Sequence, residues 1–187
     1  MKNLEISQIF RSFAKILEIK NANRFRIRAY ERAAQNFETL TEDIEQVNRE
    51  NRLLEIPGIG KDLEAKTREY LATGKIKALE DLKKTIPPGL LDVLNIPSVG
   101  PKTAGLLYRE VKIKDVDDLE KKARAGKLTG LPGIKEKTVE NILRGIALLK
   151  QGRERMSLGL AKAIAQEFIA ELKKFPEVKK ISVAGSL

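Results

Sequence analysis

Three short Gly/Pro-containing turns, each set between segments with helical periodicity, constrain the fold of this chain more than any other feature. They occupy residues 54–61 (hairpin 1), 95–103 (hairpin 2) and 129–138 (hairpin 3). Each contains an apolar residue, a proline, a small residue and a second apolar residue, a combination that ends one helix and starts the next. The spacing between the turns is too irregular for a solenoid. The sequence therefore predicts an all-α protein of short helices joined by hairpins.

The segments around the hairpins carry apolar residues at three- and four-residue steps, which is typical of helices that bury one face. The clearest are residues 4–17, 25–37, 135–151 and 158–172. Thr41 is the predicted N-cap of a further short helix. We expect Leu4 and Phe25 to lie on the buried faces of the first two helices.

The end of the chain differs in kind from the rest. Residues 178–187 are rich in Val and Ile and predict one β-strand. A single strand has no ladder partner, so we expect the chain to be part of a longer protein. The alternative is a frayed terminus. Together with the break at Pro87-Pro88-Gly89, the pattern predicts boundaries that give three parts, residues 1–86, 87–152 and 153–187.

Composition excludes several classes of function. The 187 residues include neither Cys nor His, which rules out disulfides, thiol nucleophiles and imidazole chemistry. The 36 Lys and Arg residues outnumber the 26 Asp and Glu residues, giving a net charge of +10 and favouring a polyanionic partner. No apolar run is long enough for a membrane span or follows Met1 as a signal peptide would, so we expect a soluble, cytoplasmic protein with no membrane partner.

The hairpins have the features of a phosphate site. Glycines let another backbone approach closely, and the unpaired amides at the start of the next helix attract an anion. A lysine follows each turn and adds positive charge. The alternative is that each hairpin is a tight helix–helix turn and nothing more, which the repetition in a basic chain disfavours. The candidate DNA-binding residues are Gly58, Gly60, Lys61, Ser98, Gly100, Lys102, Thr103, Gly133 and Lys135.

The copies are not equal. Ser98 replaces the first glycine of hairpin 2 and is expected to preserve the turn, whereas Lys135 replaces the second glycine of hairpin 3. Hairpin 3 therefore either binds phosphate or serves packing alone. Outward carbonyls of the first two hairpins could also hold a monovalent cation, Na⁺ or K⁺. Those carbonyls belong to Leu54, Ile56, Ile59, Leu94, Ile96 and Val99.

Three segments resemble the amino-terminal part of the family X DNA polymerases, the repair enzymes related to polymerase beta. They are residues 26–34, residues 56–60 with their continuation at 69–75, and residues 182–187. The resemblance implies helix-hairpin-helix bundles in two small subdomains, an 8-kDa-like domain and a fingers or DNA-binding subdomain. It also implies one strand of a truncated palm, in which Gly185 and Ser186 begin a nucleotide site.

The resemblance further implies a monomeric, gap-filling polymerase of base excision repair that binds gapped or nicked DNA with a 5′-phosphate. Arg26 matches a residue that contacts that phosphate. Mg²⁺ and dNTP would be bound only by the full-length protein, because the family's Asp cluster follows the strand that ends here at Leu187. We therefore expect that this chain does not polymerise by itself.

In eukaryotic members a lysine at the position of Lys66 forms a Schiff base with a 5′-deoxyribose phosphate, and Tyr30 matches an assisting tyrosine. Lys66 lies beside an apolar stripe formed by Leu63 and Tyr70, an environment that favours the neutral amine. Asp62 and Ala65 depart from the family pattern. Three hypotheses remain: a DNA-binding region in which Lys66 only contacts DNA, a lyase centred on Lys66, and a helical protein-interaction module.

Overall fold

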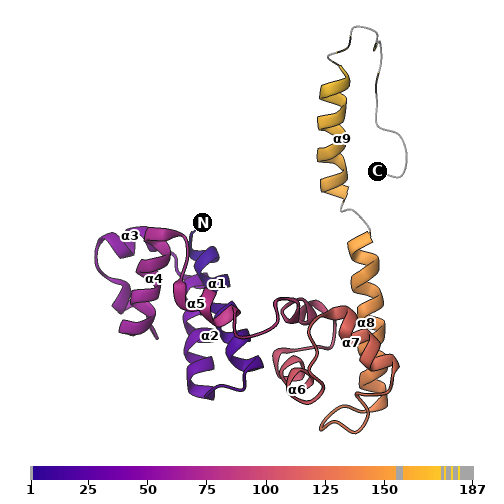
Figure 1. The fold of residues 1–187 in the computed structure, drawn as a ribbon. Coiled ribbons are helices and arrows are strands. Elements are labelled where there is room, and N and C mark those ends of the chain that lie inside the picture. The colour runs from indigo at the N-terminus through magenta and orange to yellow at the C-terminus, as the bar shows by residue number, and fades with distance from the viewer. Residues whose placement is uncertain (1, 155–157, 174, 176–177, 179–180, 182–187) are drawn as a thin grey trace. The chain divides into compact units, whose positions relative to one another are not determined.

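The computed structural model describes residues 2–154, 158–173, 175, 178 and 181. Contacts divide the chain into one compact unit of residues 1–145 and a second of residues 146–187. All regular structure in the described part is helical (Figure 1). The α-helices are α1 (Lys2–Ile19), α2 (Arg24–Thr39), α3 (Ile44–Arg49), α4 (Lys61–Thr73), α5 (Lys77–Lys83), α6 (Pro101–Val111), α7 (Val116–Arg124), α8 (Glu136–Glu154) and α9 (Leu158–Leu172). Short 3₁₀ turns occur at η1 (Leu53–Glu55), η2 (Pro88–Leu90) and η3 (Asp92–Asn95).

This arrangement confirms the helical prediction, including the long helix after hairpin 3 and the segment 158–172. The predicted strand lies largely outside the described residues, and the predicted division into three parts stays a prediction. Among the helices described, none combines the length and the apolar character that crossing a membrane requires.

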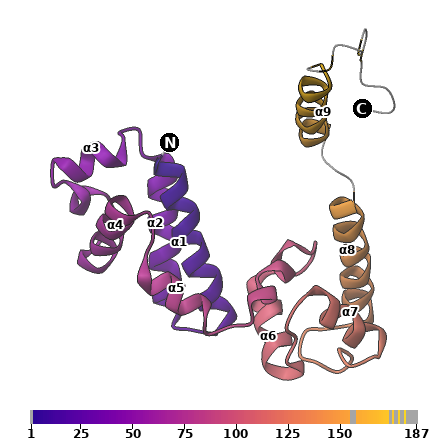
Figure 2. The same ribbon diagram turned by 45° about the horizontal axis from the view of Figure 1, so that its top comes forward.

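The core of the first unit is the antiparallel pair of α1 and α2, which lie side by side in both views (Figures 1 and 2). Ala33 and Ala34 of α2 are almost completely buried, and their small side chains let the helices approach. An aromatic cluster fills the space on either side of them. Phe13 stacks on Tyr30 with ring centroids 4.7 Å apart, and Phe10 meets the edge of Phe37 at 5.2 Å. Burial of one such side chain stabilises the fold by roughly 1.5–3 kcal/mol.

The buried faces differ from the prediction at two positions. Phe25 is 80 % exposed and Leu4 is 49 % exposed. Phe25 precedes the buried Ile27 by two residues, which places it on the opposite side of α2. On α1 the buried row begins at Asn3 rather than Leu4, because the Asn3 amide binds the loop that covers it.

Asn3 is a polar residue inside the core, only 4 % exposed. Its Nδ2 donates to the carbonyl oxygens of Leu40 at 3.1 Å and Glu42 at 2.8 Å, and its Oδ1 accepts from the Ile44 amide at 2.9 Å. This one side chain therefore fixes the start of α1 to the loop between α2 and α3.

The N-cap of α3 is not the predicted Thr41. The helix begins at Ile44, and the preceding Asp43 is the cap, with its Oδ1 accepting from the Glu45 amide at 2.9 Å. The Ile44 amide also donates to Asn3 Oδ1 at 2.9 Å, so a residue distant in the chain contributes to the start of this helix.

Helix α6 packs against the carboxyl end of α1. A Cβ added at Gly105 would lie 2.5 Å from the Ile19 carbonyl oxygen, so glycine is required there for the helices to touch. Arg109 Nη1 donates to the same oxygen at 3.1 Å. Gly145 of α8 has a similar role, because its Cβ would lie 2.9 Å from the Pro97 carbonyl oxygen in hairpin 2.

We expect Asn3→Ala to lower the free energy of unfolding by at least about 2 kcal/mol, because three backbone groups lose their partner at a buried site. Urea denaturation measures the change. Gln8→Ala, an exposed position on the same helix, is the control and should change the free energy by no more than about 0.5 kcal/mol. Equal losses for the two variants would contradict this role of Asn3.

Candidate functional site

The three hairpins share one turn geometry. In each, the amide after the turn donates to the carbonyl three residues earlier: Ile59 to Ile56 at 3.1 Å, Val99 to Ile96 at 3.0 Å, and Ile134 to Leu131 at 3.0 Å. Proline occupies the second position. The third position has φ of +77° at Gly58, +76° at Ser98 and +78° at Gly133. This is the arrangement of a type II turn, which needs a positive φ at its third position.

The turns face outward while their flanking side chains face inward. Ile56, Ile59, Ile96 and Val99 are each at most 6 % exposed, and Ile134 is 7 % exposed. The prolines and the third-position residues between them are exposed. The apolar residues thus anchor each turn to the core and present its peptide groups to solvent.

The second glycine of the first two hairpins has a different role from the first. Gly60 (φ −95°) and Gly100 (φ −86°) are N-caps of α4 and α6 in extended conformation, which any residue can adopt. A Cβ added at either would meet nothing within 4 Å. Neither backbone conformation nor internal packing requires glycine here. Neither helix has a side-chain cap, so amides at its first turn remain open to an external acceptor.

Hairpin 3 lacks this open position. Lys135 stands where Gly60 and Gly100 stand in the others, and its amide donates to Thr138 Oγ1 at 3.4 Å. The amide that precedes α8 is therefore bonded within the helix's own first turn, and a lysine side chain stands where the first two hairpins have glycine. Of the two alternatives for hairpin 3, this geometry favours packing.

Helix α2 packs against hairpin 1. Asn36 Nδ2 donates to the Pro57 carbonyl oxygen, and a Cβ added at Gly58 would lie 2.9 Å from Arg32 Cδ. No local pattern pointed to Asn36, since its partner lies 21 residues away in the chain.

The outer face of α2 carries free cations. Arg24, Arg26, Arg28 and Arg32 are exposed. Among the described residues, none of these four guanidinium groups has a carboxylate within ion-pair distance, whereas Arg11 pairs with Glu38. The exposed ring of Phe25 stands among them, a feature that the prediction of a buried Phe25 missed.

The structure places Lys66 and Tyr30 in different surroundings. The Lys66 side chain is 13 % exposed and forms an ion pair with Asp62 one turn earlier. Leu63 and Tyr70 flank it and are buried, as the helical spacing predicted. Tyr30 is 2 % exposed and lies in the aromatic core, and its hydroxyl has no hydrogen-bond partner among the described residues.

Tyr70 links α4 to α1. Its hydroxyl donates to Glu5 Oε2 at 2.8 Å. Burial raises the pKa of Tyr70, and the hydrogen bond to Glu5 raises it further. The same hydrogen bond lowers the pKa of Glu5, with a second contribution from Lys2. The side chain of Tyr70, which flanks Lys66, is therefore held to α1.

The remaining predicted residues stay predictions. Lys61 and Lys102 are exposed at the starts of α4 and α6, and Thr103 follows. For the proposed cation, the carbonyls of Ile56 and Ile96 already accept the turn hydrogen bond, which leaves each oxygen a second lone pair. The other carbonyls in that set are those of Leu54, Ile59, Leu94 and Val99. Gly185 and Ser186 lie outside the described residues.

The three turns share one geometry, and each lies between two helices. Two of them have a glycine with free space around it. This arrangement defines a helix-hairpin-helix protein. Residues 1–76 match a family model described as a helix-hairpin-helix domain, and residues 90–147 match one described as a SAM-like helix-hairpin-helix tandem.

The whole chain is also 32 % identical, over 187 residues, to the DNA polymerase/3′-5′ exonuclease PolX of Bacillus subtilis (strain 168). It spans 32 % of the length of that relative. Over its whole length the chain is therefore similar to the helix-hairpin-helix region of a family X DNA polymerase.

We expect Ser98→Gly to raise the free energy of unfolding by about 1 kcal/mol, because serine in a left-handed conformation is strained and glycine is not. Thermal or urea unfolding measures the gain. Ser12→Gly, in the middle of α1, is the control and should instead lose about 0.5–1 kcal/mol. A loss of stability in Ser98→Gly would show that the serine side chain matters more than the turn.

Proposed function

We propose that this chain is the DNA-binding region of a family X repair polymerase and that it grips the sugar-phosphate backbone of gapped DNA. The observation that carries the proposal is the open glycine at Gly60 and Gly100. Both positions combine free space, uncapped helix amides and a following lysine, which together suit a phosphate diester. No base has to be read for such binding.

The exposed face of α2 supplies a second element of the interface. Arg26 has no competing carboxylate partner among the described residues and is our candidate contact for a 5′-phosphate. The ring of Phe25 is free to stack on an unpaired base at a gap. Both interactions favour a gap or an end over continuous duplex.

Cations and nucleotides enter the proposal at different places. Neutral backbone carbonyls of hairpins 1 and 2 suit Na⁺ or K⁺, as carbonyl rings do in cation channels. The cation would bridge the turn to a DNA phosphate. Mg²⁺, dNTP and gap filling in base excision repair belong to the longer polymerase, acting as a monomer in the cytoplasm. Its palm would begin with a strand that includes Gly185 and Ser186.

The central experiment compares gapped DNA bearing a 5′-phosphate with intact duplex of equal length, by fluorescence anisotropy across a salt titration. We expect at least a tenfold preference for the gapped DNA, because counterion release alone does not distinguish the two. Gly60→Ala combined with Gly100→Ala should weaken binding to both DNAs at least tenfold while leaving thermal stability nearly unchanged.

Gly74→Ala is the matched control. Gly74 ends α4 with φ of +72° and also has free space around it, but it lies at the opposite end of that helix. This variant should lose about 1 kcal/mol of stability and keep its DNA affinity. Unaltered binding by the double glycine variant would reject the hairpins as phosphate sites. Failure to bind any DNA at low salt would favour the protein-interaction module.

A lyase activity at Lys66 is the second candidate, favoured by the burial of this lysine between Leu63 and Tyr70. The amine would have to leave Asp62, attack C1′ of a 5′-deoxyribose phosphate and expel water to form an imine. Tyr30 lies in the core, so its hydroxyl could transfer a proton only after a local rearrangement. We therefore assign it no step in this reaction.

Borohydride reduction of that imine should leave a covalent DNA adduct in the wild type. Lys66→Ala should remove it, and Asp62→Asn should increase its yield by releasing the amine. Lys77→Ala, an exposed lysine on α5, serves as the control and should leave the yield unchanged. No adduct in the wild type, or one that survives Lys66→Ala, would exclude this role.

A further inference from the structure

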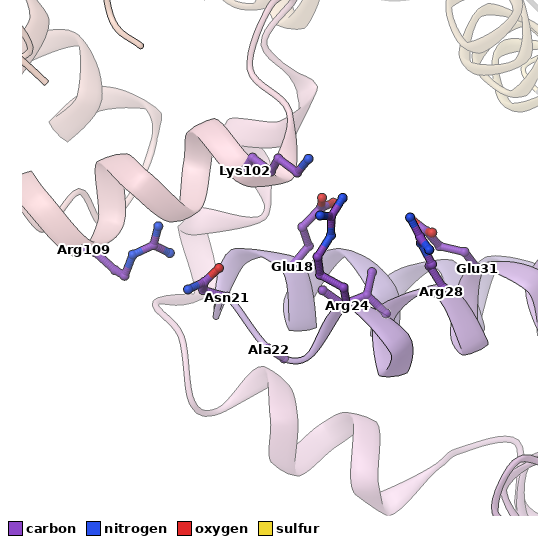
Figure 3. A pocket seen from close by; sticks show the side chains of 9 residues that line it. Glu18, Asn21, Ala22, Arg24, Arg28, Glu31, Lys102 and Arg109 are labelled. Carbon is purple, nitrogen blue, oxygen red and sulfur yellow. The ribbon is translucent and has the colours of Figure 1, made fainter. Parts of the chain in front are cut away.

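A cavity of about 560 Å³ lies where α1 ends, α2 begins and α6 passes (Figure 3). Its lining combines groups from the two segments that match different helix-hairpin-helix models. The charged residues of the lining are Glu18, Arg24, Glu31, Arg28, Lys102 and Arg109. Figure 3 shows Lys102 extending from α6 toward the side on which Glu18 and Arg24 project, with Arg28 and Glu31 farther along α2.

The contact between α1 and α6 holds these groups together. Gly105 allows α6 to lie directly against the Ile19 carbonyl, and Arg109 donates to that carbonyl at 3.1 Å. The chain after Ile19 then turns through Asn21, whose φ is +55°, before α2 begins. This turn brings Arg24 and Arg28, one helical turn apart, to the same cavity as Lys102.

The charges of the cavity are unbalanced. Four cationic side chains face two carboxylates. Among the described residues, Arg24, Arg28 and Lys102 form no ion pair, although Glu18 and Glu31 line the same space. Like charges gathered in one hollow repel one another, and an entering anion relieves that repulsion.

We propose that this cavity is a phosphate-binding site separate from the hairpin amides. Its volume falls within the usual range of ligand pockets, roughly 300–1,000 Å³, and accommodates more than a single phosphate group. The ligand is a phosphate chain: either two neighbouring diesters of a DNA strand or a free polyphosphate. Bound there, it contacts α2 and α6 together and stabilises their packing through α1.

If the phosphates belong to DNA, the proposal rests on the DNA-binding function proposed above. If the ligand is a free polyphosphate, the proposal does not depend on that function. Arg24 and Arg28 make it separable, because neither belongs to a hairpin. The test variant is therefore the pair Arg24→Gln and Arg28→Gln. The control pair is Lys121→Gln and Lys127→Gln, two exposed lysines that do not line the cavity.

Two measurements compare these variants with the wild type. The first is the thermal midpoint with sodium tripolyphosphate against sodium chloride of equal ionic strength. The second is the affinity for gapped DNA across a salt titration. If the ligand is a free polyphosphate, we expect the test pair to lose most of the rise in thermal midpoint that tripolyphosphate causes. If the ligand is DNA, we expect the test pair to bind DNA at least tenfold more weakly. The slope of log affinity against log salt concentration should then fall by about 2, since each phosphate contact contributes about 0.9.

A loss in the tripolyphosphate arm assigns the cavity to free polyphosphate, and a loss confined to the DNA arm assigns it to the DNA backbone. Behaviour equal to that of the control pair in both arms overturns the proposal. If the wild type binds no DNA, the hairpin hypothesis fails on its own and the tripolyphosphate arm decides the cavity. A wild type that tripolyphosphate does not stabilise would then overturn it.

Discussion

The burial of α1 is the constraint on which the first unit depends. This helix packs on α2 through an aromatic cluster, on the α2–α3 loop through Asn3, and on α6 through Ile19. Each contact uses a different kind of interaction: apolar burial, hydrogen bonds to buried backbone, and close approach at a glycine. Because one helix serves all three neighbours, its position determines where hairpin 1, the arginines of α2 and the start of α6 lie.

The three hairpins have the same backbone conformation but differ in the residue that follows the turn. All three use proline followed by a residue with positive φ, and all three bury the aliphatic side chain that follows that residue. They differ at the following N-cap. Glycine leaves space at the first two helix starts, whereas the third has Lys135 at this position, with its amide bonded to Thr138. The same turn connects the helices in all three hairpins. We propose that it binds phosphate only where the residue before the next helix is glycine and that helix has no side-chain cap.

The electrostatics of the chain depend on position more than on net charge. Several surface cations, such as Arg11, Arg68 and Lys122, are paired with a nearby carboxylate and add little to attraction at a distance. Within the part of the chain that the structure describes, the arginines of α2 have no ion-pair partner, and two of them share a cavity with Lys102. The arginines of α2 and Lys102 are therefore among the cations that a polyanion can reach without first breaking an ion pair.

The sequence by itself determined the helices and the hairpins, because helical periodicity and turn chemistry are local properties, and its motifs showed the resemblance to the family X DNA polymerases. It also identified Ser98 as a tolerable replacement for glycine, which the left-handed φ at that residue confirms. It could not place Phe25 or Leu4 correctly, since burial depends on which partner covers each face. Nor could it show that Asp43 rather than Thr41 caps α3.

Only the tertiary structure decided which charged groups meet. Lys102 and the arginines of α2 are far apart in the chain and share a cavity because α6 packs on the end of α1. Tyr30 matches an assisting tyrosine of the family by its motif, yet packing against Phe13 holds it in the core. Both outcomes have the same physical reason: contacts between distant segments, which no local pattern encodes, fix the surroundings of each side chain.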